Sequence, residues 1–285
     1  MHDTLLKEHQ QVMLELLQEF DRVCSKYSIS YTLFAGTLLG SIRHGGFIPW
    51  DDDIDVAVLR KDYDKFLSVA PGELKGAYYL QQEFSAHWPM FFSKLRKNGT
   101  ACIEKCIPRD KLQHQGIYID IFPIDALSDN KIAARLQFFA SKVVIAKCLY
   151  RRGYLTDSIP KKLFMQLCRA APQKMLLRFA RGDFCPQSRT VHSFFGASRS
   201  FLKSVYPRSW FRETELLPFE SCAFQAIKDA DELLTTLYGN YHIQSPPEER
   251  ALKQHAVLVD TEHSYEMYLD WQARQKYDVY TRSIR

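Results

Sequence analysis

The 285-residue sequence lacks several features that mark whole classes of protein. No uninterrupted apolar run reaches the roughly 20 residues that a membrane-spanning helix needs. The first residues, Met1 to Thr4, do not start the basic and then apolar pattern of a signal peptide. Internal repeats and low-complexity segments are absent as well. Without a membrane span or a signal pattern, we expect a cytoplasmic protein. Its composition, 46% hydrophobic and 13% aromatic residues, predicts a globular fold with a substantial core.

A disulfide framework is also missing. The seven cysteines are an odd number without regular spacing, which is typical of reduced thiols. Cys102 and Cys106 lie close together and His114 follows them, but this spacing is not a standard zinc pattern. We therefore interpret these cysteines as core or surface thiols.

Acidic residues are scarce in the segment 131–181, where Asp157 stands against twelve Lys and Arg, giving +11. The whole chain carries +5, so the remaining residues sum to −6. Apolar residues recur there at helical spacing, which predicts helices from Lys131 to Arg152 and from Pro160 to Arg181. Two interpretations stay open, a face for an anionic membrane surface or polymer and a solvated helical insertion. No nucleic-acid module is recognisable, so we expect no nucleic-acid partner.

The stretch from Gly36 to Val56, GTLLGSIRHGGFIPWDDDIDV, carries the densest chemistry. Asp53 to Val56 is predicted to be a strand, in which residues two apart share a face, so Asp53 and Asp55 should project together. Two neighbouring carboxylates repel each other unless a cation lies between them. Carboxylate oxygens are preferred ligands of Mg²⁺, which takes its other ligands from water and phosphates. The pattern therefore indicates a metal-dependent phosphoryl-type transfer site.

Two other interpretations of the acidic run are a solvated loop and a calcium loop. The apolar residues 47–50 that precede the run are a poor sequence for an exposed loop. Asp51, Asp53 and Asp55 have the spacing of calcium ligands, but the sixth position is Val56 and not glycine, and the twelfth is Asp62 and not glutamate. Both departures favour the catalytic-metal interpretation.

Basic and glycine residues around this run could bind phosphate. Gly36 and Thr37 are predicted to form a turn, with a short helix from Leu38 to Arg43 whose first amides would attract an anion. Arg43 could make a forked contact with a diphosphate or a surface salt bridge. On a predicted strand over 91–97, Lys94 shares a face with Phe92 and Arg96, which could also be a solvated face.

A second chemical stretch runs from Gly116 to Asp125, GIYIDIFPID. Asp120 is a lone acid in an apolar run, and a buried unpaired carboxylate is costly. Either a metal ion shared with Asp53 and Asp55 or a buried salt bridge would compensate for it. Asp125 is predicted to cap the next helix, and His114 is a weaker site candidate.

Several of these motifs together resemble the LicD family of bacterial phosphocholine-type transferases, similar to the fukutin-related proteins. The motifs are GTLLG, RHGGFIPWDDDID and IDIFPID, and the resemblance covers about residues 10–125. It is looser over 215–256, where YGNY precedes a Pro-Pro-Glu turn, and where Glu220 and His255 are candidates for either site or structural roles.

The resemblance implies an α/β (α+β) fold, a small mixed sheet of the nucleotidyltransferase type with helical additions. We expect a catalytic core over 1–128, a basic helical insertion over 129–213 that touches the acceptor or a membrane surface, and a C-terminal helical part over 214–285 packed on the core. A long helix over 4–27 and a shorter one over 61–67 should cover the sheet.

The resemblance also implies transfer of a phosphocholine-like group from a CDP-linked donor to a sugar hydroxyl of a cell-surface glycan such as lipopolysaccharide, capsule or teichoic acid. Mg²⁺, or Mn²⁺, would be held by Asp53, Asp55 and Asp120, and Asp120 would also orient or deprotonate the acceptor. Gly36, Thr37, Arg43 and Lys94 would bind the donor. The acceptor could be lipid-linked, with peripheral contact to an anionic inner-membrane surface. The alternatives are a nucleotidyltransferase that acts on a small molecule and a non-catalytic binding protein on this fold.

Overall fold

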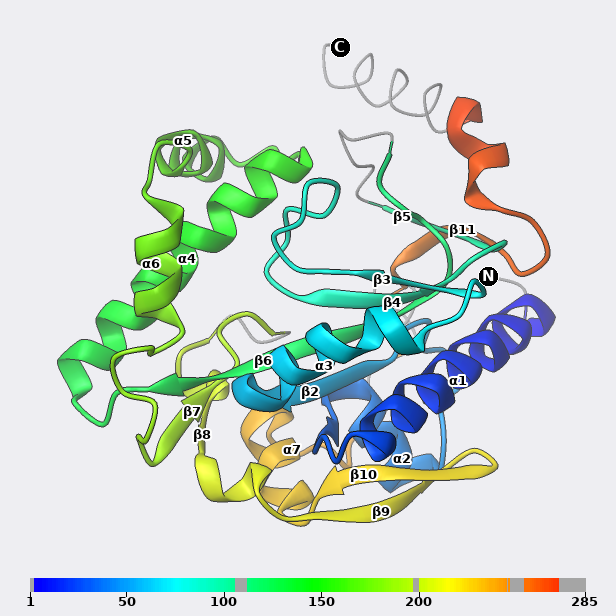
Figure 1. Cartoon of the computed structure of the whole chain (residues 1–285), viewed down its shortest axis with the longest axis horizontal. Helices are drawn as coiled ribbons and strands as arrows, with labels where there is room; N and C mark the ends of the chain where they lie inside the picture. The colour runs from blue at the N-terminus through cyan, green and yellow to red at the C-terminus, as the bar shows by residue number, and fades with distance from the viewer. Residues whose placement is uncertain (1–2, 106–111, 197–199, 245, 247–253, 272–285) are drawn as a thin grey trace.

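The computed structural model describes residues 3–105, 112–196, 200–244, 246 and 254–271 (Figure 1). Its main sheet has the strand order β1-β2-β6-β4-β3. The strands are β1 (Thr32–Leu33), β2 (Asp55–Leu59), β3 (Tyr78–Gln81), β4 (Ser93–Lys97) and β6 (Tyr118–Leu127). The pair β2/β6 is parallel and the other neighbours are antiparallel, so the sheet is mixed, as the fold class predicted.

Two helices pack on this sheet because their apolar residues repeat at helical spacing. The helix α1 (Asp3–Lys26) contacts β4 and β6, and α3 (Arg60–Glu73) contacts β2 and β6. They lie side by side across one face of the sheet (Figure 1). The ring of Phe20 on α1 meets that of Phe66 on α3 at 4.8 Å between centroids. The predicted helices over 4–27 and 61–67 are thus confirmed, the second with a longer span.

The basic segment forms α4 (Lys131–Arg152), α5 (Ile159–Cys168) and α6 (Gln173–Ala180) (Figure 1). The bounds predicted for the first helix are confirmed. A single helix from Pro160 to Arg181 was wrong, because the chain leaves α5 at Cys168 and restarts after Pro172. The strands β7 (Thr190–His192) and β8 (Val205–Pro207) then extend the sheet from the end of β6.

The predicted cap at Asp125 was also wrong. Asp125 lies inside β6, where its carboxylate accepts hydrogen bonds of 2.6 and 3.1 Å from the guanidinium of Arg60. The cap of α4 is Asn130, whose Oδ1 accepts from the amides of Ile132 and Ala133. The guanidinium of Arg60 compensates the charge of this buried carboxylate within the strand. Asp125 therefore has a structural partner five residues before the helix cap.

The C-terminal part contains strands as well as the helix α7 (Ala230–Tyr238). The strands are β9 (Thr214–Phe219) and β10 (Cys222–Ile227), which form a hairpin, and β11 (Ala256–Asp260), which pairs with β5 (Ala101–Glu104). The helix predicted from Ile227 begins three residues later, because Ile227 ends β10. The predicted terminal helix over 262–285 begins as a 3-10 turn at Tyr265–Tyr268 and continues as helix over 269–271, and 272–285 lie outside the described residues. The domain boundaries stay a prediction.

Among the described residues, no helix combines the length and the apolar character that crossing a bilayer requires.

Candidate active site

Three charged residues stand in one row across the centre of the sheet. Asp120 on β6 is the register partner of Asp55 on the parallel strand β2 and of Lys94 on the antiparallel strand β4. Register partners on adjacent strands point to the same face of a sheet. The fold therefore brings Asp55 and Asp120 together, although 64 residues separate them in the sequence. Asp53 precedes β2, which starts at Asp55, so the predicted strand began two residues too early.

The electrostatics of this row differ from those of a solvated acidic cluster. Burial and the nearby charges of Asp53 and Asp120 raise the pKa of Asp55 well above its usual range. Burial also raises the pKa of Asp120, although the ammonium of Lys94, 2.9 Å from its Oδ1, opposes that shift. Both carboxyl groups are thus held in an environment that disfavours their ionised forms and favours a bound cation.

A cavity of about 520 Å³ opens beside the row. Asp51, Asp53 and Asp55 line it together, so alternate residues of the acidic run point into the same space. The remaining wall is partly aromatic and partly basic. Its residues include Trp50, Tyr238, Tyr241, Arg43, Lys105 and His255.

Asp51 is a site residue that the sequence analysis treated only as part of a calcium-like spacing. Gly36 faces it, and a Cβ atom at that position would lie 2.9 Å from Asp51 Oδ2. The absence of a side chain at Gly36 therefore makes room for this carboxylate. The alternation of acids at 51, 53 and 55 was the signal that could have identified Asp51.

The predicted turn at Gly36 and Thr37 was wrong, because the helix α2 (Ala35–His44) already begins at Ala35. Ala35 adopts a left-handed φ of 47°, which makes the sharp change of direction after β1. Thr37 is buried, and its Oγ1 accepts a 2.8 Å hydrogen bond from the amide of Asp55. Thr37 thus positions the start of the acidic strand.

Arg43 lies at the end of α2 and lines the cavity, as a donor-binding residue should. One of its amino groups donates a 2.9 Å hydrogen bond to the carbonyl of Tyr241 and so holds the segment after α7 against α2. Its buried Nε has no hydrogen-bond partner among the described residues. The Arg43 side chain thus combines a structural contact to Tyr241 with a place in the cavity wall.

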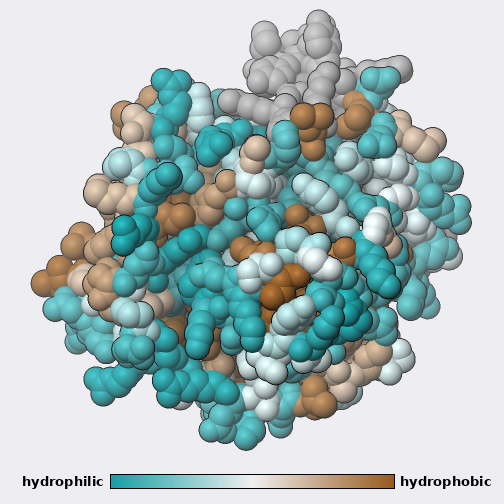
Figure 2. All heavy atoms as spheres, in the orientation of Figure 1, coloured by the Kyte–Doolittle hydropathy of each residue, from teal (hydrophilic) through white to brown (hydrophobic). Residues whose placement is uncertain are grey.

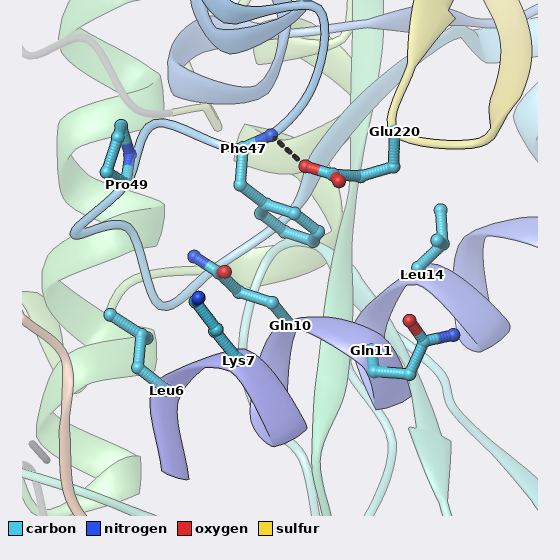
Figure 3. Close-up of a pocket in the computed structure, with 8 residues that line it drawn as sticks. All are labelled: Leu6, Lys7, Gln10, Gln11, Leu14, Phe47, Pro49 and Glu220. Atoms are coloured by element: carbon cyan, nitrogen blue, oxygen red, sulfur yellow. Dashed lines mark hydrogen bonds between the residues drawn. The ribbon is translucent and has the colours of Figure 1, made fainter. Parts of the chain in front are cut away.

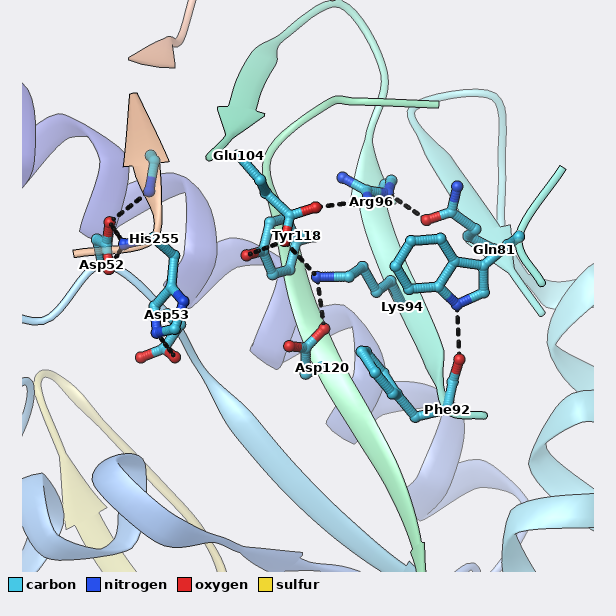
Figure 4. Close-up of polar contacts among 12 residues, drawn as sticks. Asp52, Asp53, Gln81, Phe92, Lys94, Arg96, Glu104, Tyr118, Asp120 and His255 are labelled. Atoms are coloured by element: carbon cyan, nitrogen blue, oxygen red, sulfur yellow. Dashed lines mark hydrogen bonds and ion pairs between the residues drawn. The ribbon is translucent and has the colours of Figure 1, made fainter. Parts of the chain in front are cut away.

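His255 reaches the acids from a distant part of the chain. Its Nε2 lies 3.2 Å from Asp53 Oδ2, and the hydrogen bond to Asp53 raises the pKa of His255 to about 9. The carboxylate of Asp52 holds this segment in place by accepting from the amides of His255 and Ala256 (Figure 4). Of the two roles weighed for His255, the structure thus places it at the site.

Asp52, Asp53 and His255 form a group whose ligand atoms lie within 4.8 Å of one another, close enough to share a metal ion. The oxygens of Asp52 already accept backbone hydrogen bonds. Asp53 contacts His255 and contributes to the raised pKa of Asp55 beside it. This group offers two carboxylates and an imidazole, whereas Asp53, Asp55 and Asp120 offer only oxygen ligands, which suit a hard cation such as Mg²⁺.

Lys94 is placed differently from the predicted phosphate contact. It is buried on β4, and its ammonium lies 3.1 Å from the centroid of the Tyr118 ring and 3.6 Å from Glu104 Oε1 (Figure 4). Arg96 and Arg152 also lie near Glu104, the latter at 2.7 Å. Burial would raise the pKa of Glu104, but Lys94 and the two guanidinium groups outweigh it and keep that pKa below its usual range. Lys94 is thus part of a buried ionic network behind Asp120.

Glu220 and His114 have structural roles. Glu220 Oε1 accepts a 2.9 Å hydrogen bond from the amide of Phe47 at the edge of a second hollow, next to α1 (Figure 3). Its contact fixes the loop that leads into the acidic run. His114 stacks on Tyr79 and its Nε2 lies 2.9 Å from Asn98 Oδ1, away from the acids.

Comparison with known proteins agrees with this geometry. Residues 28–148 match the LicD/FKTN/FKRP nucleotidyltransferase domain, which spans the acidic run and Asp120. This part of the chain is a LicD-family domain. It is 29% identical over 262 residues to the lipopolysaccharide cholinephosphotransferase LicD of Haemophilus influenzae, which covers 88% of this chain and 96% of that protein. The family and the predicted enzyme class, a phosphotransferase, are thereby confirmed.

Two further matches are shorter. An uncharacterised protein of Rickettsia typhi is 28% identical over 127 residues, which covers 42% of this chain and 36% of that protein. Another from Rickettsia prowazekii is 34% identical over 59 residues, 21% of this chain and 22% of that protein. Of these three relatives, the Haemophilus protein covers the largest share of the chain.

Proposed function

We propose that this LicD-family enzyme transfers phosphocholine, or a similar substituted phosphate, from a CDP-linked donor to a sugar hydroxyl of a cell-surface glycan. The row of Asp55, Asp120 and Lys94 beside a cavity lined by further acids is the observation that carries the proposal. The nearly full-length similarity to a lipopolysaccharide cholinephosphotransferase supports the choice of phosphocholine and of lipopolysaccharide. Capsule or teichoic acid would be chemically equivalent acceptors.

A divalent cation, Mg²⁺ or Mn²⁺, fits the acids of this site. Asp53, Asp55 and Asp120 would hold it. Without a cation, burial and the neighbouring acids raise the pKa of Asp55, and burial raises the pKa of Asp120, so a cation would stabilise both ionised carboxylates. Asp51 lines the same cavity and would complete the oxygen set. When bound, the cation would neutralise the charge that develops on the donor diphosphate.

The cavity wall suits a CDP-linked donor. Arg43, Lys105 and His255 are basic groups that can contact the diphosphate, and Arg43 has an unpartnered Nε. Trp50, Tyr238 and Tyr241 offer aromatic faces to the base or to a quaternary ammonium group. Lys94 is not a direct phosphate contact in this account, because it sits behind Asp120.

In the transfer step, the acceptor hydroxyl oxygen would attack the phosphorus that carries the choline. The bond from that phosphorus to the bridging oxygen would break, and CMP would leave with the electron pair. Asp120 would orient the acceptor hydroxyl or accept its proton. Basic groups of the cavity would stabilise the charge on CMP.

Two alternatives predict different products. A nucleotidyltransferase would attach the nucleoside monophosphate to its acceptor and release the other phosphate group. A non-catalytic binding protein would bind nucleotide without turnover, but its site would have no chemical need for three neighbouring acids. The cytoplasmic location and the contact with a membrane surface stay proposals.

A donor panel tests this function. The protein is incubated with Mg²⁺, lipopolysaccharide acceptor and CDP-choline, CDP-ethanolamine, CDP-glycerol or CDP-ribitol, and CMP release is measured. We expect acceptor-dependent CMP release from one donor, and none from Asp53→Asn. A parallel incubation replaces these donors with CTP. Release of pyrophosphate from CTP, with no reaction of any CDP-linked donor, would contradict the proposal and favour a nucleotidyltransferase.

A further inference from the structure

The helix α5 exposes large apolar side chains to solvent. Ile159, Leu163 and Leu167 recur every four residues, so they form one stripe on the helix. Their exposed fractions are 69%, 55% and 78%. The opposite side of α5 is the packed one, where Met165 and Cys168 contact Ala146 and Val143 of α4. Large apolar residues at the exposed positions have no role in holding α5 in place.

The same apolar character continues on α4. Its N-terminal half exposes Ile132, Leu136 and Phe139, and the stripe runs on to Val143 and Ala146, which α5 covers. Figure 2 shows brown and tan side chains among teal ones at the edge of the molecule where Figure 1 places α4 to α6. Clustered exposed apolar residues mark an interaction surface.

Two basic residues lie beside the stripe. Lys162 is on α5, Arg169 directly follows the helix as its C-terminal cap, and both are exposed. The whole segment 131–181 carries +11, with a single acid. A second copy of the chain would bring the same charge against itself, so the charge favours an anionic partner. A nucleic acid would need the charges but not the apolar stripe between them.

We propose that α5 is a membrane-docking helix, whose apolar stripe enters the interface of an anionic bilayer while Lys162 and Arg169 contact the headgroups. Apolar insertion and electrostatic attraction together give reversible peripheral binding. The inference is independent of the proposed reaction. It would place the active site next to lipid-linked acceptors.

Sedimentation of the full-length protein with vesicles tests this inference without any substrate. We expect binding to phosphatidylglycerol-containing vesicles at low salt, release at high salt, and little binding to phosphatidylcholine vesicles. The triple variant Ile159→Gln/Leu163→Gln/Leu167→Gln should bind at least about tenfold more weakly, since binding scales with the apolar area that is inserted. The charge variant Lys162→Gln/Arg169→Gln should also lose about tenfold or more, since each basic residue near the surface contributes on the order of 1 kcal/mol.

Leu216→Gln on β9 and Lys228→Gln directly after β10 are controls, because both side chains are exposed and neither is on α5. They should bind as the unsubstituted protein does. Circular dichroism checks folding, and Leu167→Gln alone replaces the triple variant if that one unfolds. Vesicle binding that the apolar variant does not weaken, equal binding to both vesicle types, or no binding to either would overturn the inference. Loss of a dimer in the apolar variant without vesicle binding would identify a self-association face instead.

Discussion

Asp55 and Asp120 are direct register partners on the parallel strands β2 and β6, so two buried carboxyl groups face the same side of the sheet. Lys94 is the register partner of Asp120 on its other side. One acid of the pair is thus compensated within the protein, and the other is surrounded by Asp53, Asp120 and Asp51. This asymmetry leaves a place for a cation on the Asp55 side.

Asp55→Asn should stabilise the metal-free protein and abolish transfer. Burial and the neighbouring acids raise the pKa of Asp55 in the folded protein, so folding is less favourable at neutral pH. Asparagine carries no charge and removes this cost. Transfer should fall roughly hundredfold or more, because the proposed cation loses a charged ligand beside the donor diphosphate. Thermal melting with EDTA and CMP release measure the two effects.

Asp125→Asn on β6 is the matched control for a buried acid. Its carboxylate is paired with the Arg60 guanidinium, which keeps the pKa of Asp125 below its usual range despite burial. Breaking this pair should destabilise the protein by about 3 kcal/mol. If Asp55→Asn destabilised the metal-free protein to the same extent, Asp55 would be a structural ion-pair residue.

Lys94→Met should destabilise the protein and weaken transfer together. It would leave Asp120 and Glu104 without the ammonium between them, at a cost of about 3 kcal/mol. Lys61→Met, at an exposed position on α3, should change neither quantity. Chemical denaturation gives the free energy of unfolding. If Lys94→Met left the free energy of unfolding unchanged and only raised the KM for the donor, Lys94 would be a direct phosphate contact.

Glu104 should make stability depend on acid pH. A carboxyl group whose pKa is lower in the folded state contributes stability above its unfolded pKa, and that contribution is lost as the pH falls through the folded pKa. The difference in free energy of unfolding between the unsubstituted protein and Glu104→Gln should therefore be largest above about pH 5 and shrink below about pH 4. A difference that stays constant from pH 3 to pH 8 would show that the charge of Glu104 is irrelevant.

Gly36→Ala should impair transfer with little effect on stability. The added Cβ would meet Asp51 Oδ2 at 2.9 Å, so this flexible carboxylate must move within the cavity. We expect transfer to fall by about tenfold or more, since small misplacements at a reacting centre are costly. Gly72→Ala on α3, where a Cβ would meet nothing within 4 Å, is the control and should be neutral or stabilising. Equal activity of the two variants would remove Asp51 from the site.

The parts of the molecule that sequence patterns predicted are those governed by local periodicity. The bounds of α4 follow from helical spacing, from the cap at Asn130 and from Gly153, whose φ of 91° ends the helix. The apolar face of α1 likewise fixed its position. The acids at 53, 55 and 120 stood out because a charge inside an apolar strand is unusual.

Long-range pairing was beyond those patterns. His255 reaches Asp53 because β11 pairs with β5 and because Asp52 accepts hydrogen bonds from the amides of His255 and Ala256. Neither contact leaves a local signal in the sequence. Asp125 resembled a helix cap because its partner Arg60 lies 65 residues earlier. The buried position of Lys94 depends in the same way on Glu104 from another strand.

The most direct test of the account follows both halves of one donor molecule. CDP-choline that carries one label in choline and another in cytidine is incubated with the protein, Mg²⁺ and lipopolysaccharide. The account predicts that the glycan gains the choline label in an amount equal to the CMP released, and that Asp55→Asn gives neither. Cytidine label in the glycan, with free phosphocholine as the second product, would contradict it.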